Sequence, residues 1–377
     1  MTRAERFVRR VAALASKEAT HIRRDVRMLY MALGMPVLLL VLFGYGVSFD
    51  VDHVPLLVVD HDQTAASREL AQRFVASDDF RLAGRVESEE EVAAWFRRFD
   101  AAMALVIPAG YSRGLGRGET IPVQLLVDGS DSSTTGTAMA MAEAIGRAAN
   151  LRAAATAGRA LAPPLTVTTW TRFNPQGRSA LFLVPGLVAY ILAIVAVMLT
   201  ALTVAREWER GSMEQLFATP VGRLDIIVGK LLPYLVIGSL QVLMVLALGA
   251  WMFDVPARGN LLVLAAAALL FMLGMLGQGL LISVVTKNQM VATQAATLSS
   301  MLPSMLLSGF LFPVENMPVP LQWVSAIVPA RYFIEVLRGV LLKGTSWAVH
   351  GFDLGMLAAF AVVMVALSTA KFERRIA

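Results

Sequence analysis

Six long apolar runs constrain this chain more than any other feature of its sequence. A lipid bilayer is crossed by about 20 helical residues, and each run is long enough, or nearly so. The runs lie near 28–48, 180–204, 231–253, 261–285, 290–313 and 351–370. The first begins too late and is too long to be a removable signal peptide, so we expect it to remain as an anchor. The sequence therefore predicts a mainly α membrane protein with a six-helix transmembrane bundle.

Composition supports a membrane protein and excludes several kinds of site. The chain is 56% hydrophobic and 16% charged, whereas soluble domains average about 45–50% and about 25%. It has no cysteine, which excludes disulfides and thiolate metal sites. The four histidines lack metal-ligand spacing, so we expect no metal site and no catalytic residue. The net charge of +5 lies mostly beside apolar runs, which indicates membrane orientation rather than nucleic-acid binding.

Charge also predicts the orientation. Eight cations precede the first run, against three acids: Arg3, Arg6, Arg9, Arg10, Lys17, Arg23, Arg24 and Arg27 against Glu5, Glu18 and Asp25. Cytoplasmic flanks are enriched in such cations, so both termini, including the tail 371–377, are expected in the cytoplasm of a bacterial cell, with the bundle in its inner membrane. Segment 49–179 is then outside and 205–230 inside.

The segment 1–27 has two interpretations. Phe7, Val11, Leu14 and Ala15 follow helical spacing among cations, which is typical of an amphipathic helix on the inner membrane surface. A positively charged flank of the anchor remains equally open.

The residues 49–179 have a different hydropathy pattern from the six apolar runs. Short β-branched stretches alternate with helical patterns, in the order strand, helix, strand, helix, strand, strand, helix, and Ser88 with Glu91 predicts a capping box. This order predicts an inserted extracytoplasmic α/β or α+β domain. Asp60 and Asp62 could form a carboxylate pair, but a turn after a strand and a helix cap explain them better.

The residues in the six runs bear on how a transporter of this sequence would obtain its energy. Their interiors lack the ionisable residues that ion-coupled transporters use at mid-depth. The chain has no phosphate-binding loop either: GRLDIIVGK has the wrong glycine spacing, and Leu231 stands where Ser or Thr binds the metal. A transporter of this kind would need an ATPase on another chain, so we expect no enzyme activity and no cofactor in this one.

At AREWERGSMEQLFATPVGRLDIIVGKLLPYLVIG the chain resembles ABC exporter permeases of the type-2 class, which share the ABCG-like fold. NPQGRSALFLVPGL and LSGFLFPVENMPVPLQWVSAIVPARYFIEVLRGVLLKG agree, and the resemblance covers essentially the whole chain. It implies a dimer with a second copy or a paralogue, an ABC ATPase partner holding ATP and magnesium, and a coupling helix in 205–230. Segment 1–27 becomes a connecting helix, and a periplasmic adaptor is a further candidate partner.

The resemblance assigns candidate functional residues. A coupling helix over 207–216 would offer the ATPase polar and apolar contacts, with Gly211 bending or breaking it; these contacts are Glu207, Glu209, Arg210, Met213, Glu214 and Leu216. The transport path would follow the second and fifth runs at the dimer interface, with lining candidates Pro185, Tyr190, Met198, Ser300 and Met305.

Pro318, Pro320 and Pro329 exclude one continuous span after the fifth run, and the resemblance implies that 314–345 forms short helices that re-enter the outer leaflet. Pro329 belongs to this outer re-entrant region, and Arg331, Arg338 and Lys343 are expected at the outer headgroup level, where long side chains reach water. Structural capping explains them better than a substrate gate.

The predicted function is export of a hydrophobic or amphipathic cargo, such as a drug, lipid or glycolipid, from the cytoplasm or inner leaflet, because the expected path is almost entirely apolar. The direction is implied only by the resemblance. A membrane sensor or scaffold that does not transport, and that uses its outer domain for binding, is the alternative. Six spans with no signalling domain after them argue against it.

Overall fold

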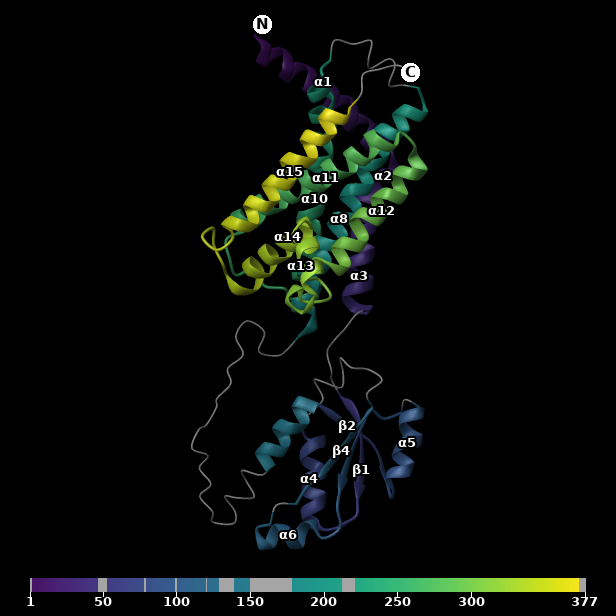
Figure 1. The fold of residues 1–377 in the computed structure, drawn as a ribbon, viewed down its shortest axis with the longest axis vertical. Coiled ribbons are helices and arrows are strands. Elements are labelled where there is room, and N and C mark those ends of the chain that lie inside the picture. Colours follow the sequence, from purple (N-terminus) through teal and green to yellow (C-terminus); the bar gives the residue numbers. More distant parts are fainter. Residues whose placement is uncertain are drawn as a thin grey trace. The chain divides into compact units, whose positions relative to one another are not determined.

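The computed structural model describes residues 2–46, 53–77, 79–98, 100–119, 121–128, 139–149, 178–211 and 221–372. The chain forms two compact units, one of Met1–Ser48 with Thr171–Ala377 and the other of Phe49–Trp170. Each unit is described here by itself. The first is helical and the second contains the sheet (Figure 1).

Four helices of the first unit are long and apolar enough to cross a bilayer. They are α8 (Ser179–Glu209), α10 (Arg223–Phe253), α11 (Leu261–Thr286) and α15 (Gly351–Lys371). Helix α8 is central, with 83% of its most apolar window buried, whereas the same fraction is 22% for α15. Four of the predicted runs are thus confirmed as helices. Their bounds need correction at 205–230, because α8 continues to Glu209 and α10 begins at Arg223.

The two other predicted runs are helical but are not among these four. The first is α2 (Val26–Leu29), a π-helical turn (Tyr30–Gly34) and α3 (Met35–Gly46), and its apolar part Tyr30–Gly46 is below the length of the other four. The fifth is α12 (Gln289–Leu306), which ends seven residues before 313 because Leu307 leaves the helical conformation. Six spans therefore remain a prediction.

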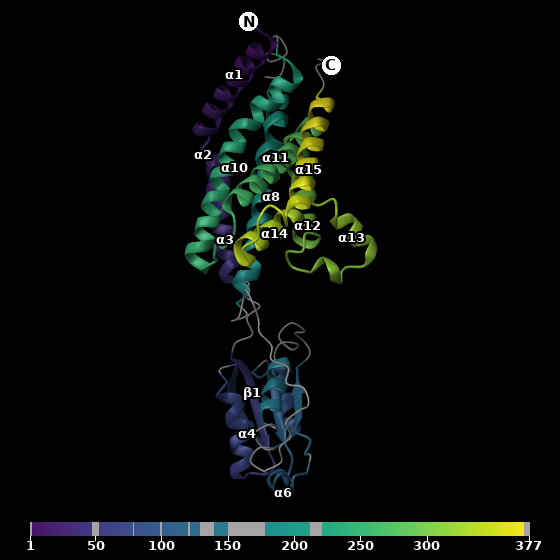
Figure 2. The ribbon, with the colours of Figure 1, turned by 90° about the vertical axis from the view of Figure 1, so that its left-hand side faces the viewer.

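The N-terminal segment is one amphipathic helix, α1 (Arg3–Arg24), begun by a capping box between Thr2 and Glu5. Its buried face carries Val11, Glu18 and Ile22 and packs along α10 (Figure 2). Gly229 of α10 makes this close approach possible, since a Cβ there would lie 2.7 Å from the Cβ of Leu14. The ends of α8 and α10 nearest α1 form what is here named the α1 end of the bundle.

Small and hydroxylated residues join the central helices. Thr200 of α8 donates a 2.8 Å hydrogen bond to the carbonyl of Leu276 in α11, and a Cβ at Gly279 would lie 2.2 Å from the carbonyl oxygen of Val197. Ser368 of α15 donates to the carbonyl of Gly277 at 3.1 Å. Lipid tails are as apolar as these helices, so burial of apolar side chains does little to drive helices together in a membrane. Close backbone packing and hydrogen bonds between helices hold them together instead.

The region after α12 consists of short helices, as the resemblance implies. They are a 3₁₀ turn (Val314–Asn316), α13 (Val319–Ser325), α14 (Pro329–Arg338) and a π-helical turn (Gly339–Lys343). Phe333 of α14 stacks on Phe271 of α11 with ring centroids 4.4 Å apart. This anchors the short helices to the long ones.

The second unit is built on a four-stranded sheet in the order β2-β1-β3-β4. Strands β1 (Val54–Asp60), β2 (Phe80–Val86) and β3 (Met103–Ile107) are parallel, with Leu56 opposite Met103, while β4 (Gln124–Val127) is antiparallel to β3. Parallel strands need crossover helices, here α4 (Ala65–Val75) and α5 (Glu89–Arg97). The sequence missed α6 (Tyr111–Arg117).

Strand alternation places helices on both faces of this sheet. Leu56 and Val58 share a core with Phe74 of α4 and with the helical residues 139–149, whereas Leu57 and Val59 face Val92 of α5. The α/β interpretation of the inserted domain agrees with this layering.

Candidate functional site

Of the six predicted coupling residues, three lie at the end of α8. Helix α8 ends at Glu209, Arg210 is its cap, and Gly211 has a φ of +70°, the left-handed conformation that commonly ends a helix. A single helix over 207–216 is therefore wrong, and Gly211 is the break, as its lack of a side chain allows. The other three candidates, Met213, Glu214 and Leu216, lie outside the described residues.

Glu207 lies in a buried charge cluster at the α1 end. Its carboxylate is 2.8 Å from the ammonium of Lys230 in α10, and that ammonium is also 3.6 Å from the carboxylate of Glu18 in α1. Tyr234 donates a 3.0 Å hydrogen bond to Glu18, and Lys17 approaches Glu207 at 3.8 Å. Three helices thus meet in one network.

Two of the charged side chains in this network are almost completely buried. Lys230 and Glu18 are only 4% and 6% exposed. Removing one member of a buried ion pair is costly, about 3–5 kcal/mol, because the remaining charge is left without compensation. The last turn of α8 is therefore joined to α1 and α10 by buried charges.

Further polar contacts join neighbouring elements at the same end. Arg206 pairs with Asp25 at 3.1 Å, and Arg10 pairs with Asp225 at 3.4 Å. Lys287 lies 4.6 Å from the ring centre of Trp208. Each contact joins α8 or α10 to a segment far away in the sequence.

Glu209, another predicted coupling residue, also makes contacts within the chain. It accepts hydrogen bonds from the backbone and the side chain of Gln289, the first residue of α12. The backbone bond first, and the side-chain bond second, hold the pKa of the Glu209 carboxyl below its usual value. Glu209 therefore fixes the start of the fifth run against the end of the second.

The predicted path residues do not line one common surface of the single chain. Pro185, Tyr190 and Ser300 are buried, Tyr190 stacking on Phe310 at 5.7 Å and Ser300 donating to the carbonyl of Ala296. Met305 is partly buried against the same core. Among the five, Met198 lines a cavity.

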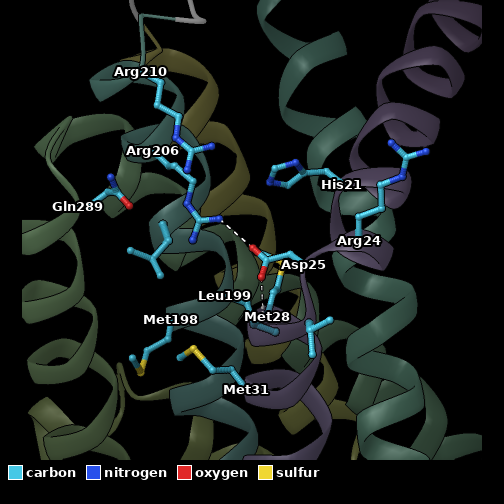
Figure 3. A pocket seen from close by; sticks show the side chains of 12 residues that line it. His21, Arg24, Asp25, Met28, Met31, Met198, Leu199, Arg206, Arg210 and Gln289 are labelled. Atoms are coloured by element: carbon cyan, nitrogen blue, oxygen red, sulfur yellow. Dashed lines mark hydrogen bonds and ion pairs between the residues drawn. The ribbon is translucent and has the colours of Figure 1, made fainter.

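That cavity lies at the α1 end, between α1, α2 and the π-helical turn on one side and α8 on the other (Figure 3). It has a volume of about 710 Å³. Its polar part holds the Arg206–Asp25 pair, with His21 and Arg210 nearby, and its apolar part holds methionines and leucines. A cavity of this size fits a small molecule or a lipid head with part of its chain.

The re-entrant arginines differ from one another. Arg331 lies 3.7 Å from Glu335 in the α14 helix that Pro329 begins, and Lys343 is exposed. Arg338 turns inward instead: it donates to the carbonyls of Gly309, Phe182 and Phe310 and lies 4.0 Å from the ring centre of Phe182. These carbonyl contacts are of the structural kind favoured above for the re-entrant cations, and the position of Arg338 at the outer headgroup level stays a prediction.

Comparison with known proteins identifies this arrangement. The model of the ABC-2 family transporter proteins matches residues 26–370. The chain belongs to this family. It is therefore a membrane permease of the ABC type-2 class, as the resemblance implies.

Two bacterial relatives cover almost the whole permease. It is 34% identical over 369 residues to the probable multidrug ABC transporter permease YbhS of Escherichia coli (strain K12), with 98% of each chain covered. It is 31% identical over 343 residues to the probable multidrug ABC transporter permease YbhR of the same organism, covering 91% of this chain and 92% of the relative. ABC transporter G family member 20 of Dictyostelium discoideum is 32% identical over 183 residues, which are 48% of this chain and 25% of that protein.

Sequence reasoning missed two members of the charge cluster. Lys230 is the last residue of the predicted inner segment 205–230, and Glu18 is counted only among the acids before the first run. A signal was present: Lys230 and Tyr234 are four residues apart, and Glu18 interrupts the apolar face of α1. Only packing reveals that these side chains meet.

Proposed function

We propose that this permease is the transmembrane subunit of an ATP-driven exporter that moves a hydrophobic or amphipathic cargo, such as a drug, lipid or glycolipid, out of the cytoplasm or inner leaflet. It acts as a dimer, with an identical copy or a paralogue, and each half binds a separate ATPase chain that holds ATP and magnesium. Six spans, an inner membrane location and cytoplasmic termini complete the proposal.

The observation that carries the proposal is the buried cluster of Glu18, Glu207 and Lys230. An ATPase that presses on segment 205–230 would act on the last turn of α8, and these charges connect that turn to α1 and α10. The contacts with the ATPase are proposed for Glu207, Glu209, Arg210, Met213, Glu214 and Leu216. Names of the two bacterial relatives support a drug-like cargo.

The path is proposed to form between two copies, from the faces of α8 and α12. Helix α12 has an exposed stripe of apolar side chains at helical spacing, including Leu298, Leu302 and Leu306. In a membrane these side chains face lipid or a second copy. Of the predicted lining residues, Met198 has the most suitable position, because it already borders a cavity.

The test is reconstitution of the permease with the ATPase that co-purifies with it. ATP hydrolysis and cargo uptake into vesicles are measured together. We expect Glu214→Gln to lower the amount of cargo moved per ATP about tenfold, since loss of one central interface contact costs roughly 1–2 kcal/mol. Glu315→Gln, an exposed acid in the short helices after α12, is the matched control and should leave coupling unchanged.

Two results would overturn the proposal. One is transport by the purified permease alone on a proton or sodium gradient. The other is unchanged coupling in both Glu214→Gln and Met213→Ala. If no ATPase co-purifies and the outer domain binds a ligand, the sensor or scaffold interpretation replaces it.

A further inference from the structure

The cavity at the α1 end has the chemistry of a binding site with two distinct parts. Figure 3 shows Arg210 and Arg206 on α8 and His21 on α1 approaching one another from opposite walls, with Met28, Met31 and Met198 beyond them. All twelve lining residues belong to the helical unit. The polar and apolar parts are therefore held in one body.

The polar part has an excess of positive charge. Its basic side chains are His21, Arg24, Arg206 and Arg210, whereas Asp25 is the one acid that lines it. Asp25 is paired with Arg206 at 3.1 Å. Within the described part of the chain, neither Arg210 nor His21 has an ion pair.

This excess favours an anion rather than a neutral or zwitterionic group. Guanidinium groups bind phosphates and carboxylates through paired hydrogen bonds, and such charge-assisted bonds are about twice as strong as neutral ones. The choline or ammonium of a zwitterion would meet the same cations and be repelled. A free inorganic anion would leave the apolar part of the cavity unfilled.

The apolar part matches an alkyl chain. Met28 is buried, Met31 and Met198 are partly buried, and Leu199 and Leu202 complete the lining. Methionine is unbranched and polarisable, so it adapts to chains of different shape. The methionines belong to the first and second apolar runs, and the cations belong to the segments that flank them.

We propose that this cavity binds an anionic amphiphile, with its phosphate or carboxylate head on Arg210, Arg206 and His21 and its chain on Met28, Met31 and Met198. Two sources share this chemistry, an acidic phospholipid of the membrane and an acidic cargo on its way to export. The second source rests on the proposed function, whereas binding itself does not.

Binding is tested on the full chain in phosphatidylcholine nanodiscs without an ATPase. Radiolabelled dodecyl phosphate is the probe, dodecylphosphocholine is the zwitterionic match, and binding to empty nanodiscs is subtracted. We expect one saturable site per chain for dodecyl phosphate and none for dodecylphosphocholine. Equal binding of the two amphiphiles would overturn the inference.

Variants then place the site. Arg210→Gln should weaken dodecyl phosphate binding about tenfold, through loss of a charge-assisted contact. Arg223→Gln, which removes an exposed cation at the same end outside the cavity, should bind like the unaltered chain. Met198→Trp should also lower binding by filling the apolar part, and unchanged thermal midpoints show that the variants are folded. If Arg210→Gln and Arg223→Gln bind alike, the site is not this cavity.

The two sources are separated with acidic nanodiscs and with the ATPase complex. If phosphatidylglycerol displaces the probe, and the complex neither hydrolyses ATP faster with the probe nor moves it, the occupant is a membrane lipid. If the probe stimulates hydrolysis and His21→Gln, a change in the cavity outside the proposed ATPase contacts, reduces that stimulation, the occupant is a cargo. Both results support the site. If dodecyl phosphate does not bind but ATP-driven transport is intact, this inference alone is refuted. If dodecyl phosphate binds but no ATPase partner exists, the proposed function alone is refuted.

Discussion

The ammonium of Lys230 lies 2.8 Å from the carboxylate of Glu207, although the two residues belong to different helices and Lys230 is only 4% exposed. Glu18 of α1 approaches the same ammonium at 3.6 Å. One cation between two carboxylates therefore holds α1, α8 and α10 together, at the end of the bundle where an ATPase is proposed to act.

Lys230→Met should destabilise the permease strongly. The substitution leaves Glu18 and Glu207 close together without their cation, and loss of one member of a buried pair costs about 3–5 kcal/mol. The thermal midpoint of the purified protein in detergent measures this loss. Lys17→Met is the matched control, because the Lys17 side chain is 62% exposed and contacts the same Glu207 at 3.8 Å; an exposed pair contributes at most about 1 kcal/mol. Equal midpoints for the two variants would contradict the account.

Gly229→Ala should loosen α1 from α10. The added Cβ would lie 2.7 Å from the Cβ of Leu14, and such overpacking costs about 1–3 kcal/mol, more than the gain of roughly 1 kcal/mol in helix propensity. Trypsin should then cleave faster at the arginines of α1. Gly355→Ala in α15 meets open space and should leave this rate unchanged. A slower cleavage in Gly229→Ala would show that the two helices tolerate the methyl group.

Arg338→Lys should not behave as a conservative change. The guanidinium reaches carbonyls of Gly309, Phe182 and Phe310 together, and an ammonium cannot span the same three acceptors. We expect a loss of about 1–3 kcal/mol in stability, seen as a lower thermal midpoint. The exposed Lys343 provides the control, since Lys343→Gln should have a midpoint within error of the original. A midpoint for Arg338→Lys equal to that control would mean that the carbonyl contacts contribute little.

Asp62 should make one turn of the second unit sensitive to acid. Its carboxylate accepts hydrogen bonds from the Thr64 hydroxyl at 2.7 Å and from the backbone amides of Gly110 and Ser112 at 2.8 and 3.0 Å. The Thr64 bond first, with the amide bonds, lowers the pKa of Asp62 below its usual value. Because the folded pKa is the lower one, the stabilisation is present above the unfolded pKa of about 4 and is lost as pH falls through the folded pKa.

Hydrogen exchange of the full chain measures this effect at residues 108–117. At neutral pH, Asp62→Asn should exchange faster than the original chain at these amides, and the difference should shrink when Asp62 is protonated. Glu87→Gln, at an exposed acid in the same unit, should show no such pH-dependent difference. A constant difference at all pH values would exclude the carboxylate as the cause.

Local sequence patterns predicted much of the fold. Apolar length identified α8, α10, α11 and α15, the prolines near 318–329 excluded one continuous span there, and Ser88 caps the start of α5. Strand and helix periods placed four strands and three helices of the second unit. Such signals depend on neighbours within a few residues, so the chain carries them before it folds.

The sequence alone thus determined that this is a membrane permease with an inserted domain, because hydropathy and motif spacing are local properties. Only the tertiary structure decided which charges meet. Glu18 and Lys230 pair although they are more than 200 residues apart. Arg206 pairs with Asp25 of a distant segment, and Arg338 contacts the start of α8. Those pairings follow from how α1, α8, α10 and α14 pack. Local sequence patterns do not predict that packing, because the paired residues are far apart in the chain.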